Sequence, residues 1–139
     1  MTRKVDHLVV HCSATKAKSK VTATDIDKWH RARGFFGCGY HYVITRDGTI
    51  QSHASGDRCR PLDMPGAHVG DCGPGWNKRS IGICMVGGLD EEGKPEDNFT
   101  GEQWVALDEL VNKVLKEHPT ITHLGGHRDL IKATNAPPK

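Results

Sequence analysis

The chain has 139 residues, of which 36% are hydrophobic and 26% are charged, as in ordinary globular domains with one core. Its formal net charge of +2 is too small to predict the clustered basic stripe of a nucleic-acid-binding domain, and no run approaches the ~20 apolar residues that a membrane-spanning helix needs. We therefore expect a single domain over residues 1–139, a monomer that neither binds nucleic acid nor inserts into a membrane.

The N-terminal segment gives an expectation about where the protein is made. Residues 1–6 lack the apolar core of a signal peptide. We therefore expect the protein to be made and kept in the cytoplasm. Any function elsewhere would need lysis of the cell or a specialised secretion route.

The first predicted elements are a strand and a helix. Residues 7–11 form a short apolar run that is typical of a buried strand. Thr22 and Asp25 match the capping box that begins many helices, and Gly34 suits the position just after a helix end. The sequence therefore predicts a helix over residues 23–33.

A hairpin and a long loop follow. Residues 40–46 and 49–51 are rich in β-branched and aromatic side chains and flank the turn dipeptide Asp47-Gly48, which predicts a β-hairpin. Residues 55–79 hold many Gly, Pro, Asp and Arg without a clear period. Because long loops in compact domains often carry function, we expect a functional loop here.

The second half of the chain predicts a strand, a helix and a last strand. Residues 80–86 form an apolar run, Thr100 and Gln103 form a second capping box, and residues 121–124 form the last strand. The apolar stripe of the helix comprises Trp104, Leu107, Leu110, Val111, Val114 and Leu115. The order of elements predicts an α/β fold, a single domain with a mixed central β-sheet flanked by helices.

The cysteine pattern does not predict a dedicated zinc knuckle, because the five cysteines are odd in number and form no CxxC pair. Cys12 and Cys84 lie in or beside apolar runs, where a reduced thiol behaves as a small hydrophobe, so we expect both in the core. Cys59 and Cys72 flank the long loop, and a disulfide between them in an oxidising compartment stays an open alternative.

Two of the nine histidines stand out by their position. His11 ends the first predicted strand, and His127 follows the last one across two glycines. Histidines at strand ends that face a loop-lined cleft are well placed as metal ligands. For one histidine alone, a hydrogen-bonded imidazole without a metal would be the better interpretation. The choice between this interpretation and a metal ligand therefore depends on the sequence around both histidines.

Five strings occur in a fixed order along the chain. They are His11-Cys12-Ser13-Ala14-Thr15, Gly39-Tyr40-His41-Tyr42-Val43-Ile44, Arg46-Asp47-Gly48-Thr49, Ser80-Ile81-Gly82-Ile83 and Gly126-His127-Arg128-Asp129. In this order they resemble the N-acetylmuramoyl-L-alanine amidases of the phage lysozyme type and the related peptidoglycan recognition proteins. The resemblance runs from about residue 7 to residue 138. It implies a peptidoglycan substrate, cut between the muramoyl lactyl group and L-alanine, and one bound Zn²⁺.

The resemblance also implies roles for individual residues. His11 and His127 match the two histidine ligands of the zinc ion. Tyr40 and Thr134 match the family's catalytic positions, where hydroxyl groups can stabilise the oxyanion formed on the amide carbonyl. Zinc with three protein ligands keeps an open position for water and lowers the pKa of that water toward ~7.

The third zinc ligand of the family, a cysteine or aspartate, falls on Ala136, which has no donor atom. Without a one-residue gap the position falls on Asn135, which is a poor zinc ligand. Two interpretations stay open: an engineered or otherwise inactivated form in which alanine replaces cysteine, or a non-catalytic module that binds peptidoglycan without cutting it. If the chain is active as it stands, Asp129 is the first alternative ligand to test.

Three loop residues, His68, Asn77 and Arg79, resemble the family's substrate groove and could bind the glycan or the peptide stem. A solvated polar loop is an equally good interpretation. The remaining histidines considered, to which we assign no role, are His30, His41, His53, His118 and His123.

A cysteine hydrolase using Cys12 beside His11 is a weaker alternative. Adjacent residues of a strand face opposite ways, so this pair would be badly oriented for catalysis. The amidase interpretation, combined with the N-terminal segment, places the protein's action at the bacterial cell wall after lysis or specialised secretion. A delivery or immunity partner is not identified by these residues.

Overall fold

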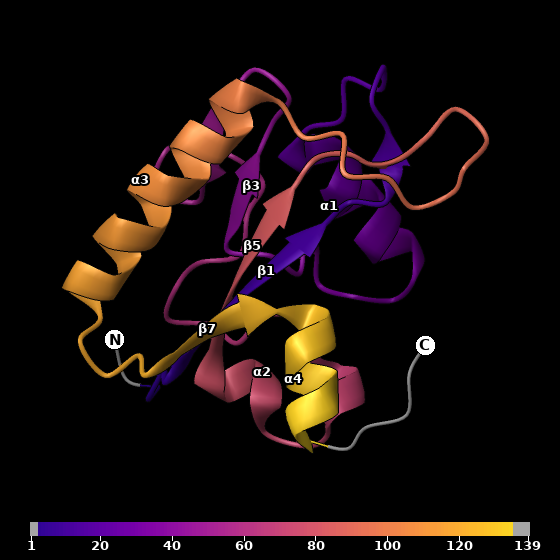
Figure 1. The fold of residues 1–139 in the computed structure, drawn as a ribbon. Coiled ribbons are helices and arrows are strands. Elements are labelled where there is room, and N and C mark those ends of the chain that lie inside the picture. Colours follow the sequence, from indigo (N-terminus) through magenta and orange to yellow (C-terminus); the bar gives the residue numbers. More distant parts are fainter. Residues whose placement is uncertain (1–2, 135–139) are drawn as a thin grey trace.

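The computed structural model describes residues 3–134, and a five-stranded mixed sheet runs through its centre (Figure 1). The strands lie in the order β4-β3-β5-β1-β7, and only the β3–β4 pair is antiparallel. The elements are β1 (His7–Cys12), β2 (Thr15–Lys16), α1 (Ala23–Ala32), β3 (Tyr42–Ile44), β4 (Ile50–Ser52), η1 (Gly70–Cys72), α2 (Trp76–Arg79), β5 (Ser80–Met85), β6 (Gly88–Leu89), α3 (Gly101–Glu117), β7 (His123–Gly126) and α4 (His127–Thr134). The predicted α/β fold with a mixed central sheet is confirmed.

Helix α3 covers one face of the sheet. Leu8 of β1 and Ile81 and Ile83 of β5 are fully buried on this face, where they pack against Leu110 and Val114 of α3. The helix begins at the predicted capping box, with the Thr100 hydroxyl accepting the backbone N–H of Gln103. Burial of this apolar stripe holds the helix against the sheet.

The opposite face is covered by two separate groups of elements. Ile26 of α1 packs against Val43 and Cys84 near the β3 side of the sheet. Val9 of β1 and Leu130 of α4 meet in a second cluster, together with η1. Because successive strand residues face opposite ways, Val9 points away from the α3 side that its neighbour Leu8 occupies. The space between the two groups of elements is where the candidate site lies.

The predicted helix over 23–33 and the predicted hairpin are both present. Helix α1 ends one residue earlier than expected, with Arg33 as its C-cap, and Thr22 and Asp25 form the capping box. The hairpin is β3–β4, and its turn holds Gly48 at a φ of +85°, which favours glycine. Its strands are shorter than predicted, and Tyr40 precedes β3 rather than belonging to it.

Other predicted boundaries differ from the structure. The long loop 55–79 contains two short helices, η1 and α2, and the last strand is 123–126 rather than 121–124. Helix α4 was not predicted at all. It follows β7 directly, and the Asp129 carboxylate accepts the backbone N–H of Gly126 across this junction at 2.9 Å. A small parallel pair, β2–β6, was also missed, because two-residue strands carry no period.

One cysteine prediction is wrong, and one alternative left open by the sequence is not found. Cys84 is fully buried as expected, but Cys12 is exposed, because burial on its side of β1 falls off toward the strand end. Cys59 packs beside Cys38 and Cys84, whereas Cys72 packs in the separate cluster with Val9. Cys59 and Cys72 are therefore not joined by a disulfide.

The apolar stripe predicted for α3 is also only partly buried. Trp104 is 48% exposed and rests its ring against Phe99, with 5.7 Å between the centroids. The neighbouring Gln103 is buried instead, because its amide donates to the backbone carbonyls of Ile44 and Val86. Among the helices of residues 3–134, none combines the length and the apolar character needed to cross a membrane.

Candidate active site

Aromatic and titratable side chains gather around His11, at the end of β1. The centroid of its ring lies 4.8 Å from that of His127, 4.9 Å from that of His68 and 5.1 Å from that of Tyr40. A pocket of about 340 Å³ opens over this group. Its lining residues are His11, His30, Arg33, Phe35, Tyr40, Ala67, His68, Gly70, Asp71, Asn77 and His127.

Strand register brings His11 and His127 together. Strands β1 and β7 are parallel neighbours in which Val10 pairs with Gly126. His11 follows Val10 in β1, and His127 follows Gly126 as the first residue of α4. Val9 and His11 share the face opposite to α3, so the imidazole of His11 projects between α1 and α4.

His68 reaches the site from the long loop and is held tightly there. The Asn77 amide oxygen accepts the backbone N–H groups of His68 and Val69 at 3.0 and 2.9 Å. The imidazole packs over Gly82 of β5, where an added Cβ would lie 2.9 Å from the ring. Asn77 therefore positions the loop besides lining the pocket, and Gly82 leaves room for the ring.

Burial keeps the imidazoles of His11 and His68 neutral. Burial, reinforced by the nearby His127, lowers the pKa of His11 to about 3. Burial and then His11 hold the pKa of His68 well below its usual value. The two rings share a hydrogen bond of 2.9 Å between His11 Nε2 and His68 Nδ1. The buried His68 Nε2 has no hydrogen-bond partner among the described residues.

Tyr40 lies beside His11 and is largely enclosed. Burial is the main cause that raises the pKa of the Tyr40 hydroxyl above its ordinary value. The hydroxyl therefore keeps its proton at neutral pH and remains a hydrogen-bond donor. Its ring also packs 5.5 Å from that of His30, whose Nδ1 accepts the backbone N–H of Gly39 at 2.8 Å.

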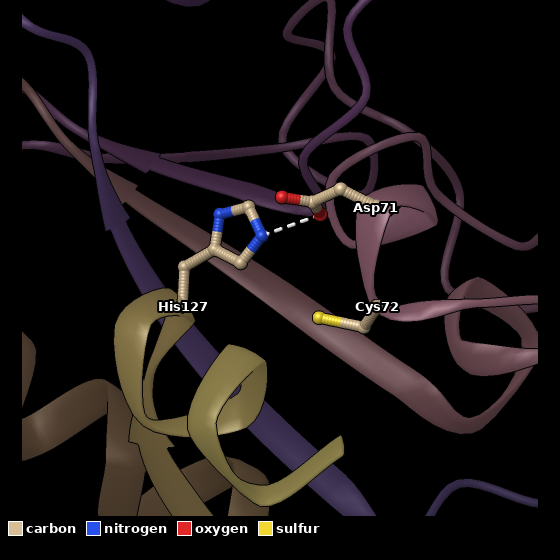
Figure 2. A group of neighbouring side chains, drawn as sticks. All are labelled: Asp71, Cys72 and His127. Atoms are coloured by element: carbon tan, nitrogen blue, oxygen red, sulfur yellow. Dashed lines mark hydrogen bonds and ion pairs between the residues drawn. The ribbon is translucent and has the colours of Figure 1, made fainter. Parts of the chain in front are cut away.

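An acidic residue completes the group on the α4 side. His127 Nε2 lies 2.7 Å from Asp71 Oδ1, and Asp71 belongs to η1 (Figure 2). The Asp71 side chain is only 7% exposed, and its second oxygen, Oδ2, has no hydrogen-bond partner among the described residues. The sulfur of Cys72 points toward the same space (Figure 2). Donor atoms of Asp71, Cys72 and His127 all lie within 4.8 Å of one another.

The other residues proposed from the sequence lie elsewhere. Arg79 pairs with Asp6 at 2.9 Å and stacks 4.1 Å over the Trp76 ring, and it is not among the described residues that line the pocket. Thr134 is the last residue of α4. Ala136 and Asn135 lie outside the described residues, so the family's third-ligand position has no structural description.

Sequence reasoning gave no role to several residues that line the pocket, among them His30, Arg33, Phe35 and Asp71. His30 had a usable signal, because it lies four residues after the buried Ile26 on the same face of α1. Asp71 had none, since the loop around it has no period. His41 is not at the pocket: it is buried, accepts the Gly82 N–H at Nδ1 and donates from Nε2 to the Met64 carbonyl.

Comparison with known proteins assigns the chain. The model of the N-acetylmuramoyl-L-alanine amidase family matches residues 1–139. The chain belongs to this family. It is 40% identical over 128 residues to an endolysin of Klebsiella phage KP32. The aligned residues cover 92% of this chain and 78% of that endolysin. These findings support an amidase acting on peptidoglycan.

Two solved structures have the same fold. LysC, an N-acetylmuramoyl-L-alanine amidase from Clostridium intestinale, superposes with a TM-score of 0.73 at 30% identity, covering 92% of this chain and 73% of LysC. Drosophila PGRP-LB superposes with a TM-score of 0.69 at 22% identity, covering 94% of this chain and 73% of PGRP-LB. The second likeness concerns the fold alone. The resemblance of the five sequence strings to this family is thus confirmed.

Proposed function

We propose that this amidase domain, residues 1–139, hydrolyses the amide bond between N-acetylmuramic acid and L-alanine in a zinc-dependent reaction. The observation that supports this most directly is the convergence of His11 and His127 at the mouth of one pocket, with ring centroids 4.8 Å apart. The protein acts as a monomer on the bacterial cell wall, reaching it after lysis or specialised secretion, as a phage endolysin would. Nucleic acid is not a partner.

The donor atoms present fit a zinc ion. Zinc prefers imidazole nitrogen, thiolate sulfur and carboxylate oxygen, and all three donor types occur around His127. The low pKa of His11 keeps a lone pair free for a metal at neutral pH. A buried carboxylate oxygen of Asp71 has no hydrogen-bond partner within residues 3–134, which is a further sign that a cation belongs here. When bound, zinc would polarise the amide carbonyl and make a water molecule more acidic.

Residues of the chain position the substrate and stabilise charge. The protonated Tyr40 hydroxyl donates to the carbonyl oxygen as negative charge develops on it, and Thr134, by its match to the family, provides a second hydroxyl. Arg33 lies 5.2 Å over the ring of Phe35 at the pocket rim. This pair offers an apolar surface and a positive charge to the sugar and to a stem carboxylate.

The three loop residues proposed from the sequence contribute to substrate binding in different ways. His68 faces the pocket and contacts the peptide near L-alanine, whereas Asn77 acts mainly by holding the His68 backbone. Arg79 would contact only more distant parts of the substrate, because its guanidinium is engaged by Asp6 and Trp76.

A second candidate function is binding of peptidoglycan without cleavage. Ala136 favours it, because alanine at the family's third-ligand position cannot hold zinc. In that case the same pocket would bind the muramoyl peptide and release it unchanged.

The test uses purified peptidoglycan as the substrate. Amidase activity should release peptides with a free L-alanine amine and should create no new reducing sugar ends. Chelation of zinc should abolish release, and added zinc should restore it, while His11→Ala should not be restored. Cosedimentation with peptidoglycan without any release in zinc would instead support the binding module.

A further inference from the structure

Two buried thiols lie against each other on the face of the sheet that α1 covers. Cys38 and Cys59 are 2% and 6% exposed, and both pack in the cluster that holds Ile26 and Val43. A hydrogen bond between the two thiols lowers the pKa of Cys38 and raises the pKa of Cys59 above its ordinary value. The sulfur atoms are therefore neighbours, although one belongs to the connection between α1 and β3 and the other to the long loop.

The backbone segments that carry the two thiols are tied together. The Arg60 N–H, directly after Cys59, donates to the Tyr40 carbonyl at 2.9 Å, and Arg60 Nε donates to the Cys38 carbonyl at 3.1 Å. On the other side, the Asp27 carboxylate accepts the Cys38 N–H at 2.8 Å. A disulfide forms without large backbone movement only where two cysteines face each other on neighbouring segments. These hydrogen bonds and the contact of the thiols meet that condition.

A pocket of about 390 Å³ opens over the pair. Both cysteines line it, together with the three arginines Arg31, Arg58 and Arg60. Positive side chains favour the thiolate, which is the form that attacks a disulfide, and Arg60 acts in this direction on the pKa of Cys38. The pocket thus gives a small reactant a route to the buried pair.

We propose that Cys38 and Cys59 are a redox site, which closes to a disulfide by exchange with a low-molecular-weight disulfide in an oxidising compartment. The Cys38 thiolate attacks one sulfur of the external disulfide, whose S–S bond breaks, and the first external thiolate leaves and takes up a proton. Cys59 then loses its proton to solvent and attacks the Cys38 sulfur, releasing the second external thiolate, which is protonated in turn. The protein thiols are oxidised by two electrons, and the external disulfide is reduced to two thiols.

The bond would brace the segment that presents Tyr40 to the active site. Gly39, between Cys38 and Tyr40, donates its N–H to His30 Nδ1 at 2.8 Å, and its carbonyl accepts the Ala67 N–H at 3.0 Å. A cross-link at this point limits the freedom of the unfolded chain over the loop that it closes, and so stabilises the folded chain. This role goes beyond the proposed amidase function and does not depend on zinc.

The other three cysteines fit the role less well. Cys84 packs in the same cluster but is fully buried, and it is not among the described residues that line the pocket. Cys12 is exposed at the end of β1, and Cys72 packs in the separate cluster with Val9. Cys38 and Cys59 both line the pocket and share a hydrogen bond, so they are the pair to test.

The first experiment maps the bond in the unaltered protein. The reduced protein is incubated with oxidised glutathione, the remaining thiols are alkylated, and the peptides are identified by mass spectrometry. The expected result is a pair of peptides linked through Cys38 and Cys59, which a phosphine reductant separates. Alkylated Cys38 and Cys59, glutathione retained on either of them, or a bond from either to another cysteine would overturn the proposal.

The second experiment measures the stabilisation by thermal unfolding. Oxidation should raise Tm by about 5–15 °C, the effect of closing a loop of this length in a domain of this size, and reduction should reverse the rise. Cys38→Ser and Cys59→Ser should each remove the difference between oxidised and reduced samples, whereas Cys72→Ser, which alters another buried cysteine, should keep it. Equal Tm values for the two redox states of the unaltered protein, or a difference that survives in Cys38→Ser, would contradict the proposal.

The peptidoglycan assay keeps the redox site apart from the proposed function. Zinc chelation should inhibit cleavage in both redox states, because neither cysteine is among the described residues that line the pocket of His11. At a temperature between the two Tm values, only the oxidised protein should still cleave peptidoglycan. Equal activity of the two redox states at that temperature counts against the redox site, whereas cleavage that no chelator inhibits counts against zinc dependence alone.

Discussion

His11 and His127 stand at opposite ends of the chain, and their imidazole centroids lie 4.8 Å apart. The cause is the parallel register of β1 and β7, which sets Val10 beside Gly126 and so makes the two histidines neighbours at the carboxyl ends of adjacent strands. In an open sheet with parallel strands, ligand sites gather at this end, because the connecting loops meet there.

Tyr40→Phe should lower the turnover of peptidoglycan by about 10²–10³-fold, the usual effect of removing one donor to an oxyanion. Binding of peptidoglycan should change little, because the ring and its packing on His11 and His30 remain. Kinetic assays beside cosedimentation measure the two effects separately. Tyr42→Phe is the control, since Tyr42 is buried in the core on the α3 side. Equal turnover in both variants would remove Tyr40 from the reaction.

Gly82→Ala should displace the imidazole of His68 in the site. The added Cβ would lie 2.9 Å from the His68 ring, and the ring is held in place by its loop. We expect a loss of about 1–3 kcal/mol in the free energy of unfolding, the usual effect of overpacking, together with a fall in activity. Gly101→Ala is the control, because a Cβ there meets nothing within 4 Å. Denaturant unfolding and the peptidoglycan assay measure both. An unchanged Gly82→Ala variant would mean that His68 is mobile.

Acidification should destabilise the metal-free protein through buried histidines such as His41. Burial lowers the pKa of His41 to about 3 from an ordinary value of 6.5, so between these values the unfolded chain binds the proton and the folded chain does not. Stability is therefore fully present above the unfolded pKa and declines as the pH falls below it, by up to about 1.4 kcal/mol per pH unit for one such group.

Urea unfolding at about pH 7.5 and about pH 4.5 tests this dependence. His41→Gln should reduce the loss between the two pH values, because glutamine does not titrate. His53→Gln, which alters an exposed residue, should leave the loss as it is. The same pH slope in the His41 variant and in the unaltered protein would contradict the prediction.

Asp129→Ala should destabilise α4 without removing a metal ligand. The Asp129 carboxylate accepts the Gly126 N–H at 2.9 Å, as a cap at the start of the helix. We expect a loss of about 1 kcal/mol in the free energy of unfolding, as for other caps, with zinc affinity reduced far less than by His127→Ala. Asp108→Ala, on the exposed side of α3, is the control. If Asp129→Ala lost zinc as completely as His127→Ala, Asp129 would itself be a zinc ligand.

Local sequence signals predicted much of the fold. The capping boxes at Thr22 and Thr100 place the beginnings of α1 and α3, because side-chain to backbone hydrogen bonds at a helix start depend on residues only three positions apart. The Asp47-Gly48 turn predicts the hairpin, since glycine tolerates the positive φ found there. Helix α4 was missed because it follows β7 without a connecting loop, and its cap is shared with the strand end.

The fold class, the family and the pair of candidate zinc ligands could be predicted from the sequence, since these depend on local patterns and on the order of short strings. The other side chains that share the site became known from the three-dimensional arrangement of the chain. Asp71 gave no functional signal in the sequence, and His30 gave only its place on the buried face of α1. Both line the pocket of His11, while Arg79 is engaged by Asp6. The physical reason is that strand register and loop packing bring together residues whose separation along the chain carries no pattern, and burial then changes their protonation and hydrogen bonding.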